Sequence, residues 1–262
     1  MENNLVTMSN TLLKASYEIS LVEKRLLLAF ISQIDNDICR KEGREKDNLP
    51  IITSDTRYTL DVKSYADLYS IDYEAAKDEL EIAVDKLFQK EVTFTTDEGK
   101  ITTRWIGSKI KYTKGEHTLG LKWASDIIPF ISELRDNFTS YRLRFLSTIS
   151  SVYALRLYEL FIMELNRSYK SHVEVTVTVE QLRDMLALGN KYTLFADFRK
   201  RVIEEPISQL NKDKNSNITI SITDKDGKKL YNKKGKQVVS ITFRIKRKVK
   251  ETKYLTMETT NE

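Results

Sequence analysis

The feature that most constrains how this chain folds is an internal repeat. A predicted order of helix, strand, short helix, helix and β-hairpin occurs in the first half of the chain and again in the second. A shift of 117 residues places Leu60 on Val177, and a shift of 123 residues places Leu80 on Ile203. Because predicted caps and core positions coincide, we interpret the halves as one supersecondary unit used twice. Chance similarity of two helical patterns is the alternative.

Each half is predicted to begin with an amphipathic helix. Ser20 with Glu23 has capping-box spacing, as has Thr178 with Gln181 in the second half, and Asp61 is placed to cap a short helix. After Ser20, apolar residues recur every four positions. In the second half, the apolar residues of the run 151–165 lie on one side of a helix. Alternation of apolar and polar residues predicts the strands that follow. The other predicted elements of the first half are strand 57–62, helices 64–70 and 73–90, hairpin 91–113 and strand 117–123; those of the second half are strand 172–179, helices 179–188 and 191–211, and strands 217–223 and 237–248.

This order of elements is typical of a winged helix, which is a helix-turn-helix followed by a β-hairpin. The helix before the hairpin usually enters the major groove of DNA. The predicted fold class is therefore α+β, with two tandem winged-helix domains related by internal duplication. We place the N-terminal domain at residues 1–138, the C-terminal domain at residues 139–250 and a polar tail at residues 251–262.

The basic charge of the chain is concentrated near its end. The formal net charge is +5, but residues 224–254 contain twelve Lys or Arg and only three acidic residues. This region therefore carries +9, which leaves −4 for the rest of the chain. A localised basic region is typical of a nucleic-acid-binding protein. The alternative is a solvated segment that only keeps the protein soluble.

Several classes of catalytic and metal site lack their parts in this sequence. The single cysteine, Cys39, excludes a disulfide within the chain and any multi-cysteine zinc module. No Gly-Lys pair has the spacing of a phosphate-binding loop, and the two histidines, His117 and His172, are far apart in the sequence. We therefore expect a protein that is not an enzyme and that needs no cofactor and no metal.

The sequence shows no targeting or membrane segment. The N-terminus has no basic head followed by an apolar run, and no apolar stretch approaches the roughly 18 residues of a membrane-spanning helix. We expect a cytoplasmic protein that does not contact a membrane.

The predicted helix 191–211 has the features of a DNA-contacting helix. Its apolar residues Phe195, Phe198, Val202 and Leu210 are predicted to face the core. The opposite side would present basic and polar residues near its N-terminal end, where Arg and Lys suit guanine and the helix dipole favours phosphate. The candidate DNA-binding residues on this helix are Lys191, Thr193, Lys200 and Arg201, with Arg199 at the border of the two faces. A merely solvated face is the alternative.

Lysines of the predicted hairpins are the second group of candidate DNA-binding residues. Lysines along a phosphate backbone contribute affinity through counterion release but carry no sequence information. The first-half helix at 73–90 has mostly acidic neighbours, so we expect the first half to contact DNA more weakly or to pair with another copy. The candidates are Lys228, Lys229, Lys233 and Lys234 in the second half, and Lys109 and Lys111 in the first.

Pro206 lies inside the same predicted helix. Proline lacks the backbone N–H and pushes the preceding residue away from helical angles, so we expect a kink or a restart near Glu205. One hypothesis is that this bend directs the basic half toward the DNA groove. A tolerated kink without functional role is the alternative.

Three segments in this order also resemble a known protein family. They are SNTLLKASYEISLVEKRLLLAFI, SVYALRLYELF, and FRKRVIEEPISQLN followed by a strand. The chain resembles the replication initiator (Rep) proteins of theta-replicating bacterial plasmids, which bind directly repeated sequences called iterons. The resemblance covers nearly the whole chain.

The resemblance implies functions for both domains. The second domain would be the main DNA-contacting domain, and the first would supply dimer contacts and additional contacts to the DNA backbone. A monomer would bind double-stranded DNA at the origin, and a dimer would repress the protein's own gene. The host's chromosomal initiator and replicative helicase would be partners, and no nucleotide would be needed.

Two other functions are compatible with parts of the sequence. A transcriptional regulator with tandem winged helices would share every feature of composition and spacing, and a binding site with only an inverted repeat would favour it. A rolling-circle nicking enzyme would need closely spaced histidines to hold a metal beside a nucleophilic tyrosine, and the histidine count argues against it.

Overall fold

The computed structural model describes residues 1, 3–34, 52–96, 99–110, 117–134, 136–223 and 226–248 of the 262-residue chain. The chain divides into two compact units. The first comprises Met1–Val152 with Met185–Ala187, and the second comprises Tyr153–Asp184 with Leu188–Glu262. Among the described residues, none of the helices combines the length and the apolar character that crossing a membrane requires.

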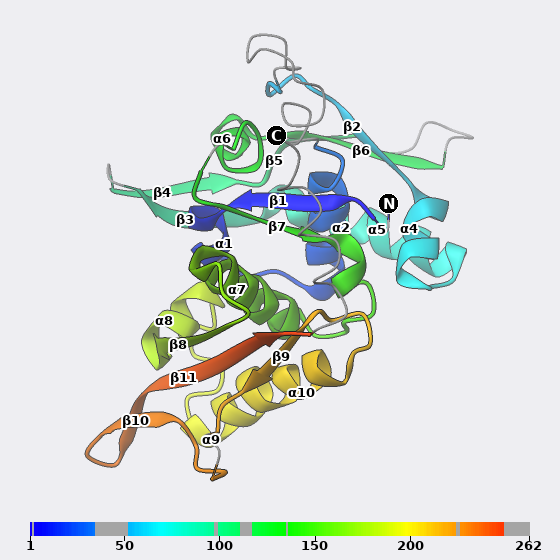
Figure 1. The fold of residues 1–262 in the computed structure, drawn as a ribbon. Helices are drawn as coiled ribbons and strands as arrows, with labels where there is room; N and C mark the ends of the chain where they lie inside the picture. The colour runs from blue at the N-terminus through cyan, green and yellow to red at the C-terminus, as the bar shows by residue number, and fades with distance from the viewer. Residues whose placement is uncertain are drawn as a thin grey trace, which may run out of the picture. The chain divides into compact units, whose positions relative to one another are not determined.

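The first unit contains most of the helices and three small sheets (Figure 1). Its main helices carry polar caps: Ser20 and Glu23 form the predicted capping box, and the side chains of Asp61 and Asp72 accept hydrogen bonds at the starts of two further helices. The helices are α1 (Asn10–Lys14), α2 (Leu21–Ile31), α4 (Val62–Tyr69), α5 (Tyr73–Gln89) and α6 (Ile128–Ile131), with short 3-10 turns η2 (Ser125–Ile127) and η3 (Leu143–Leu146).

The described strands of the first unit form three separate antiparallel sheets. Strand β2 pairs with β6, which also pairs with β5, while β3 pairs with β4 and β1 pairs with β7. The sequence predicted one strand through residue 105, but the buried Trp105 interrupts it, and the two parts join different sheets. The strands are β1 (Leu5–Ser9), β2 (Tyr58–Asp61), β3 (Glu91–Thr96), β4 (Gly99–Arg104), β5 (Ile106–Ile110), β6 (Thr118–Trp123) and β7 (Phe138–Arg142).

The second unit repeats the order of helix, strand, short helix, long helix and strands. Its elements are α7 (Val152–Ser168), β8 (His172–Thr178), α8 (Val179–Met185), α9 (Phe195–Phe198), the π-helical segment η4 (Arg199–Glu204), α10 (Glu205–Lys212), β9 (Ile218–Ser221), β10 (Tyr231–Lys234) and β11 (Gln237–Arg247). In both units the first strand of the repeat pairs with the last one, β2 with β6 and β8 with β11. The equivalent residues Leu60 and Val177 lie opposite Leu119 and Ile241.

The long strand β11 organises the sheet of the second unit. One edge of β11 pairs with β8, and the other pairs with β10 and then with β9 (Figure 1). Ile241, Phe243 and Ile245 alternate along β11 and are buried. The helix formed by α9, η4 and α10 contributes Phe198, Val202 and Leu210 to the same core. This packing leaves the outer side of that helix in solvent.

The division between the units lies later in the chain than residue 138, where the sequence placed it. Strand β7 pairs with β1, and Thr139 Oγ1 donates a hydrogen bond to Asn10 Oδ1 at 2.7 Å. These contacts hold residues 138–142 in the first unit, and the contact division falls at Val152. The dimerisation and DNA-contact functions that we assigned to the two domains stay predictions.

Candidate nucleic-acid interface

The helix that precedes the hairpin of the second unit runs from Phe195 to Lys212, and we call it the recognition helix. It comprises α9, η4 and α10 in direct succession. Phe198, Val202, Ile203 and Leu210 are buried, as expected for the inner side of the helix. Phe195 is only half-buried, although the sequence placed it in the core.

The recognition helix accommodates Pro206 through a π turn. The Glu205 N–H donates to the Lys200 carbonyl, five residues back, as in a π-helix. Pro206 lies in the first turn of α10. Backbone N–H groups of a first turn have no carbonyl partner within their helix, so the N–H that proline lacks costs α10 no hydrogen bond. Glu205 keeps helical angles (φ −61°, ψ −48°), so the preceding residue is not pushed out of the helix as we expected. The helix restarts as an α-helix at Glu205 without leaving the helical path.

The connection between α8 and the recognition helix is held by Arg183, a residue that the sequence interpretation missed. Its guanidinium donates hydrogen bonds to the carbonyls of Tyr192 at 2.9 Å, Gly189 at 2.7 Å and Lys191 at 2.8 Å. Charged hydrogen bonds of this kind are stronger than neutral ones. Arg183 therefore fixes the turn that carries the candidates Lys191 and Thr193.

Basic and polar side chains are exposed just before the recognition helix and in its first half. The helix begins at Phe195, so Lys191 and Thr193 lie in the preceding turn and not on the helix as the sequence predicted. Thr193, Lys200 and Arg201 are exposed, and so is Lys191. Arg201 Nη1 lies 3.5 Å from Glu205 Oε2, but its side chain is 57% exposed, so solvent screens this pair. Lys191 and Thr193 thus lie before the recognition helix, whereas Lys200 and Arg201 lie within its π-helical segment.

Arg199 lies in a cluster that joins the recognition helix to the following strands. Glu204 Oε2 lies 3.6 Å from Arg199 Nε, and its Oε1 accepts a hydrogen bond from Lys229 Nζ at 2.8 Å. Tyr231 packs edge-on against Phe195, with ring centroids 5.8 Å apart. Burial and then the Glu204 carboxylate raise the pKa of Tyr231, so its hydroxyl stays protonated at neutral pH. Two of the predicted DNA-binding residues, Arg199 and Lys229, thus share one carboxylate.

The lysine-rich segment after β9 contains a regular β-hairpin, which we call the wing (β10–β11). The sequence suggested a long turn here, but Tyr231–Lys234 pairs with β11, and the turn contains only Gly235 and Lys236. Gly235 has φ +62°, which glycine adopts without strain. Lys233 and Lys234 are exposed on β10, and Lys228 is exposed before it.

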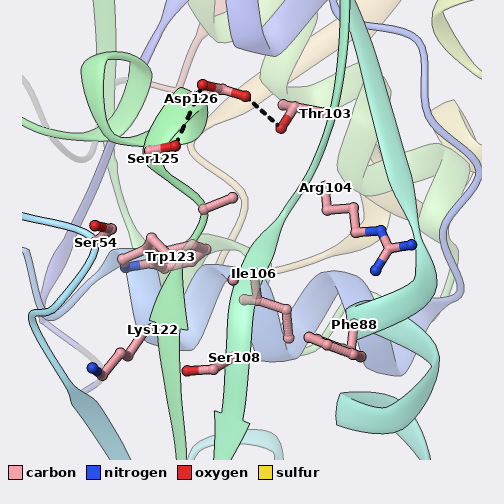
Figure 2. Close-up of a pocket in the computed structure, with 12 residues that line it drawn as sticks. Ser54, Phe88, Thr103, Arg104, Ile106, Ser108, Lys122, Trp123, Ser125 and Asp126 are labelled. Atoms are coloured by element: carbon pink, nitrogen blue, oxygen red, sulfur yellow. Dashed lines mark hydrogen bonds between the residues drawn. The ribbon is translucent and has the colours of Figure 1, made fainter.

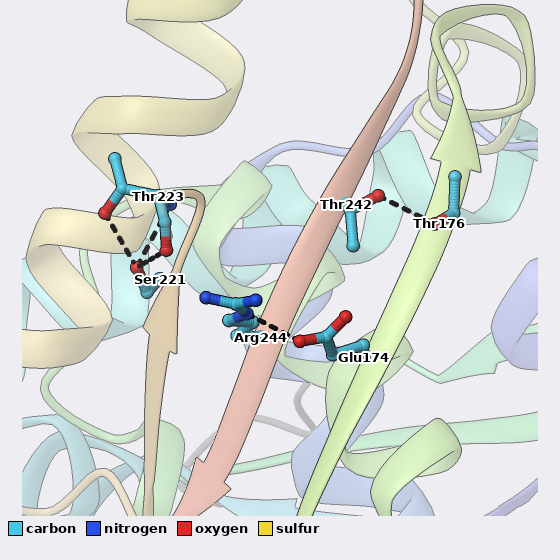
Figure 3. A network of polar contacts seen from close by, with 6 residues as sticks. All are labelled: Glu174, Thr176, Ser221, Thr223, Thr242 and Arg244. Carbon is cyan, nitrogen blue, oxygen red and sulfur yellow. Dashed lines mark hydrogen bonds and ion pairs between the residues drawn. The ribbon is translucent and has the colours of Figure 1, made fainter. Parts of the chain in front are cut away.

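Three further basic residues, Arg244 and Arg247 of β11 and Lys248 after it, form hydrogen bonds inside the second unit, whereas Lys246 of β11 is exposed. Arg244 Nε donates to Glu174 Oε1 at 2.6 Å across the strands, beside the Thr176–Thr242 pair (Figure 3). Arg247 Nη2 donates to Asn166 Oδ1 at 2.5 Å, and Lys248 Nζ donates to the Asp213 carbonyl at 3.0 Å. Burial lowers the pKa of Lys248. The basic region of the sequence therefore divides into an exposed wing and a structural part.

The equivalent helix of the first unit, α5, has a different surface. Its exposed residues include Glu74, Asp78 and Glu79, and the capping carboxylate of Asp72 precedes them. An acidic surface repels DNA phosphates. The candidate Lys109 on β5 forms an ion pair with Asp85 of α5 and lies over the Phe88 ring. Lys111 lies outside the described residues.

The first unit also contains a shallow pocket, which is a second possible site. It has a volume of about 520 Å³ and lies beside β5, β6 and η2 (Figure 2). Its carboxylate, Asp126, accepts hydrogen bonds from Thr103 at 3.0 Å and Ser125 at 3.4 Å, and its Lys122 pairs with Asp55. The lining offers neither a histidine nor a cysteine, so it contains no nucleophile with a neighbouring imidazole base. The lining residues are Ser54, Phe88, Thr103, Arg104, Ile106, Gly107, Ser108, Lys122, Trp123, Ala124, Ser125 and Asp126.

Two family models match the chain. One is described as "Initiator Replication protein, WH1" and matches residues 5–162, and the other is described as "Initiator Rep protein, WH2" and matches residues 178–245. Together they confirm the predicted pair of winged-helix domains.

Individual proteins agree with this match. A replication initiation protein of Escherichia coli is 23% identical over 233 residues, which are 87% of this chain and 67% of that protein. The crystal structure of the Pi initiator protein in complex with iteron DNA matches 95% of this chain and 99% of its own, with a TM-score of 0.71 and 19% identity. At this identity the likeness shows the fold.

Proposed function

Since this chain belongs to the family of initiator replication proteins that consist of a WH1 and a WH2 domain, we propose that it starts replication of a bacterial plasmid by binding direct repeats at the origin. The family membership confirms the predicted class of protein, a DNA-binding initiator and not an enzyme. The E. coli relative is itself a replication initiation protein.

The observation that carries the proposal is the surface of the second unit. The exposed Thr193, Lys200 and Arg201 precede or lie within the π turn, and the exposed Lys233 and Lys234 lie on the wing. A helix contacts base edges in the major groove, whereas lysines of a hairpin contact phosphates. Iteron DNA is the ligand in the solved structure of the Pi initiator, which has this fold.

The contacts suggest separate functions for the basic residues. Lys191, Thr193, Lys200 and Arg201 would contact bases and nearby phosphates, and Lys228, Lys233 and Lys234 would contact the backbone along the wing. Arg199 and Lys229 both pair with Glu204, so they would mainly hold the recognition helix against the wing. Lys109 is engaged by Asp85 and would contribute little to DNA binding.

The first unit would serve assembly and accessory contacts. The acidic residues on α5 disfavour insertion of this helix into a DNA groove, so DNA contacts of this unit would come from other basic residues. By resemblance to the plasmid initiators, a dimer formed through this unit would repress the protein's own gene. The host's chromosomal initiator and replicative helicase would join the monomer at the origin.

The test is fluorescence anisotropy of the full chain on DNA flanking its own gene, against scrambled DNA, at two salt concentrations. Preference for direct repeats that persists at higher salt would support base contacts at an origin. Equal binding to both DNAs, weakening together with salt, would contradict the proposal, because counterion release alone would then explain the affinity. Preference for only an inverted repeat in the promoter would indicate a transcriptional regulator.

A further inference from the structure

Leu194 directly precedes the recognition helix, and its side chain is exposed to solvent. The residue is 68% exposed, and Ile82 and Tyr169 are the other exposed large hydrophobic residues in the described part of the chain. An aliphatic side chain that stays in water gains no burial free energy. Packing of the free protein therefore does not account for a leucine at this position.

Leu194 also occupies a position that favours a different kind of residue. It is the N-cap residue of α9, with φ −74° and ψ 130°, and its side chain accepts no hydrogen bond. Ser, Thr, Asp and Asn are preferred at an N-cap because their oxygens accept from the first free N–H groups of the helix. In the first unit, Asp72 at the same cap position accepts from Glu74 N at 2.9 Å and Ala75 N at 3.2 Å. The second unit thus has a leucine where a cap would stabilise the helix.

The neighbours of Leu194 belong to the surface proposed to face DNA. Thr193 and Ala196 are exposed on either side of it, and Lys200 and Arg201 are exposed further along the same helix. A side chain at the start of a recognition helix is placed where such helices touch base edges. The inference rests on the proposed function, because it assumes that this end of the helix enters the major groove.

We propose that Leu194 contacts the C5-methyl group of a thymine in each repeat and thereby selects thymine at one position. The methyl group of thymine is the apolar group that base pairs present in the major groove. Cytosine offers an amino group at the corresponding edge and no methyl, so it would leave the leucine against a polar surface. Leu194 would add a preference for one base that the cationic side chains around it do not supply.

The experiment uses duplexes that the full chain selects from a random pool. Each thymine of the selected sequence is replaced in turn by deoxyuridine, which removes the methyl and keeps the base pair, and binding is measured by anisotropy. For the wild type, one replacement should weaken binding about fivefold. Leu194→Ala should bind the thymine duplex about five- to tenfold more weakly and should no longer respond to that replacement. Ile82 on α5 is another exposed aliphatic residue, so Ile82→Ala is the matched control and should keep the wild-type profile.

A second variant separates contact from folding. Leu194→Ser provides a capping hydroxyl, so its melting temperature should rise while its response to deoxyuridine disappears. If wild type and both Leu194 variants respond alike to every replacement, the thymine contact is wrong, although the proposed function stands as long as the selected sequence is preferred. If the wild type selects no sequence at all, the proposed function and this inference fall together.

Discussion

The recognition helix of the second unit and α5 of the first unit occupy the same place in a repeated fold, yet their surfaces differ in almost every respect. Helix α5 is one uninterrupted α-helix with an aspartate cap and acidic exposed residues. The recognition helix has a leucine at its cap, a π turn, a buried proline and exposed basic residues. Both keep their apolar residues inside, Leu80 in one and Ile203 in the other. The two helices therefore share a buried apolar side, whereas their outer surfaces differ, and only the surface in the second unit suits the proposed contact with DNA.

The largest effect is expected from the exposed cations. Lys200→Ala with Arg201→Ala should cost roughly 1 to 3 kcal/mol of binding free energy for each lost base contact and should reduce the preference for the specific site. The matched control is Lys77→Ala with Lys86→Ala on α5, which should change DNA affinity little. Anisotropy on specific and scrambled DNA measures both. An equal loss of DNA affinity in the variant with Lys77→Ala and Lys86→Ala would contradict the proposed difference between the two helices, because it would indicate that both contact DNA.

The next effect concerns the connection before each helix. The connection before α5 is Ser70–Asp72, whereas the connection between α8 and the recognition helix is the longer Leu186–Leu194, where Arg183 donates to three carbonyls. Arg183→Ala should lower the free energy of unfolding by about 2 kcal/mol and weaken DNA binding. Denaturant unfolding, with Arg167→Ala as a surface control, measures the first effect. A change no larger than that of the control would mean that the turn holds its conformation without Arg183.

Pro206→Ala tests whether the π turn matters for DNA contact. The alanine N–H could bond to the carbonyl four residues back, so the segment could return to α-helical geometry and reposition Lys200 and Arg201. We expect a loss of about 1 kcal/mol in binding free energy, which is about fivefold in affinity. Pro129→Ala in α6, also a proline in a first helical turn, is the control. Unchanged affinity and stability would make Pro206 a tolerated proline without function.

The smallest effects are expected on the hairpins. Lys233→Gln with Lys234→Gln on the wing should weaken binding to all DNA alike and reduce the salt slope by about 0.9 for each lysine. Lys109→Gln in the first unit should leave the slope unchanged, because Asp85 already neutralises this lysine. Titrations at several salt concentrations distinguish the two. A shallower slope for Lys109→Gln would show that the first unit also binds phosphate through β5.

The parts of the fold that could be predicted are those that depend on near neighbours in the sequence. The Ser20 capping box is present, with both hydrogen bonds, and Thr178 N donates to Gln181 as its spacing suggested. Asp61 caps α4 as expected. Caps bond to N–H groups two or three residues away, so their spacing is visible in the sequence.

Features that depend on distant contacts could not be predicted. The interruption at Trp105 follows from pairing with two different strands, and periodicity does not reveal which strands pair. Arg244 is one of the basic residues counted in the region 224–254, but it donates a hydrogen bond to Glu174, which lies 70 residues earlier in the sequence. Arg183 donates hydrogen bonds to backbone carbonyls, and because every residue has a carbonyl, such contacts leave no pattern of residue types in the sequence. The sequence therefore identified the helix and the hairpin that carry the candidate residues, but it did not separate the exposed basic residues from those that form ion pairs within the fold.

Glu204 has a consequence for the geometry of the DNA that this protein can accept. Its carboxylate faces Arg199 of the recognition helix and Lys229 at the base of the wing. Because both cations pair with the same carboxylate, the distance between the recognition helix and the base of the wing cannot change without breaking an ion pair. If the helix contacts bases and the wing contacts phosphates as proposed, the two sets of contacts would keep one fixed spacing along the double helix. One base pair inserted between the two contacted regions of the DNA would rotate the phosphates away from the wing lysines, even if the bases contacted by the helix were unchanged.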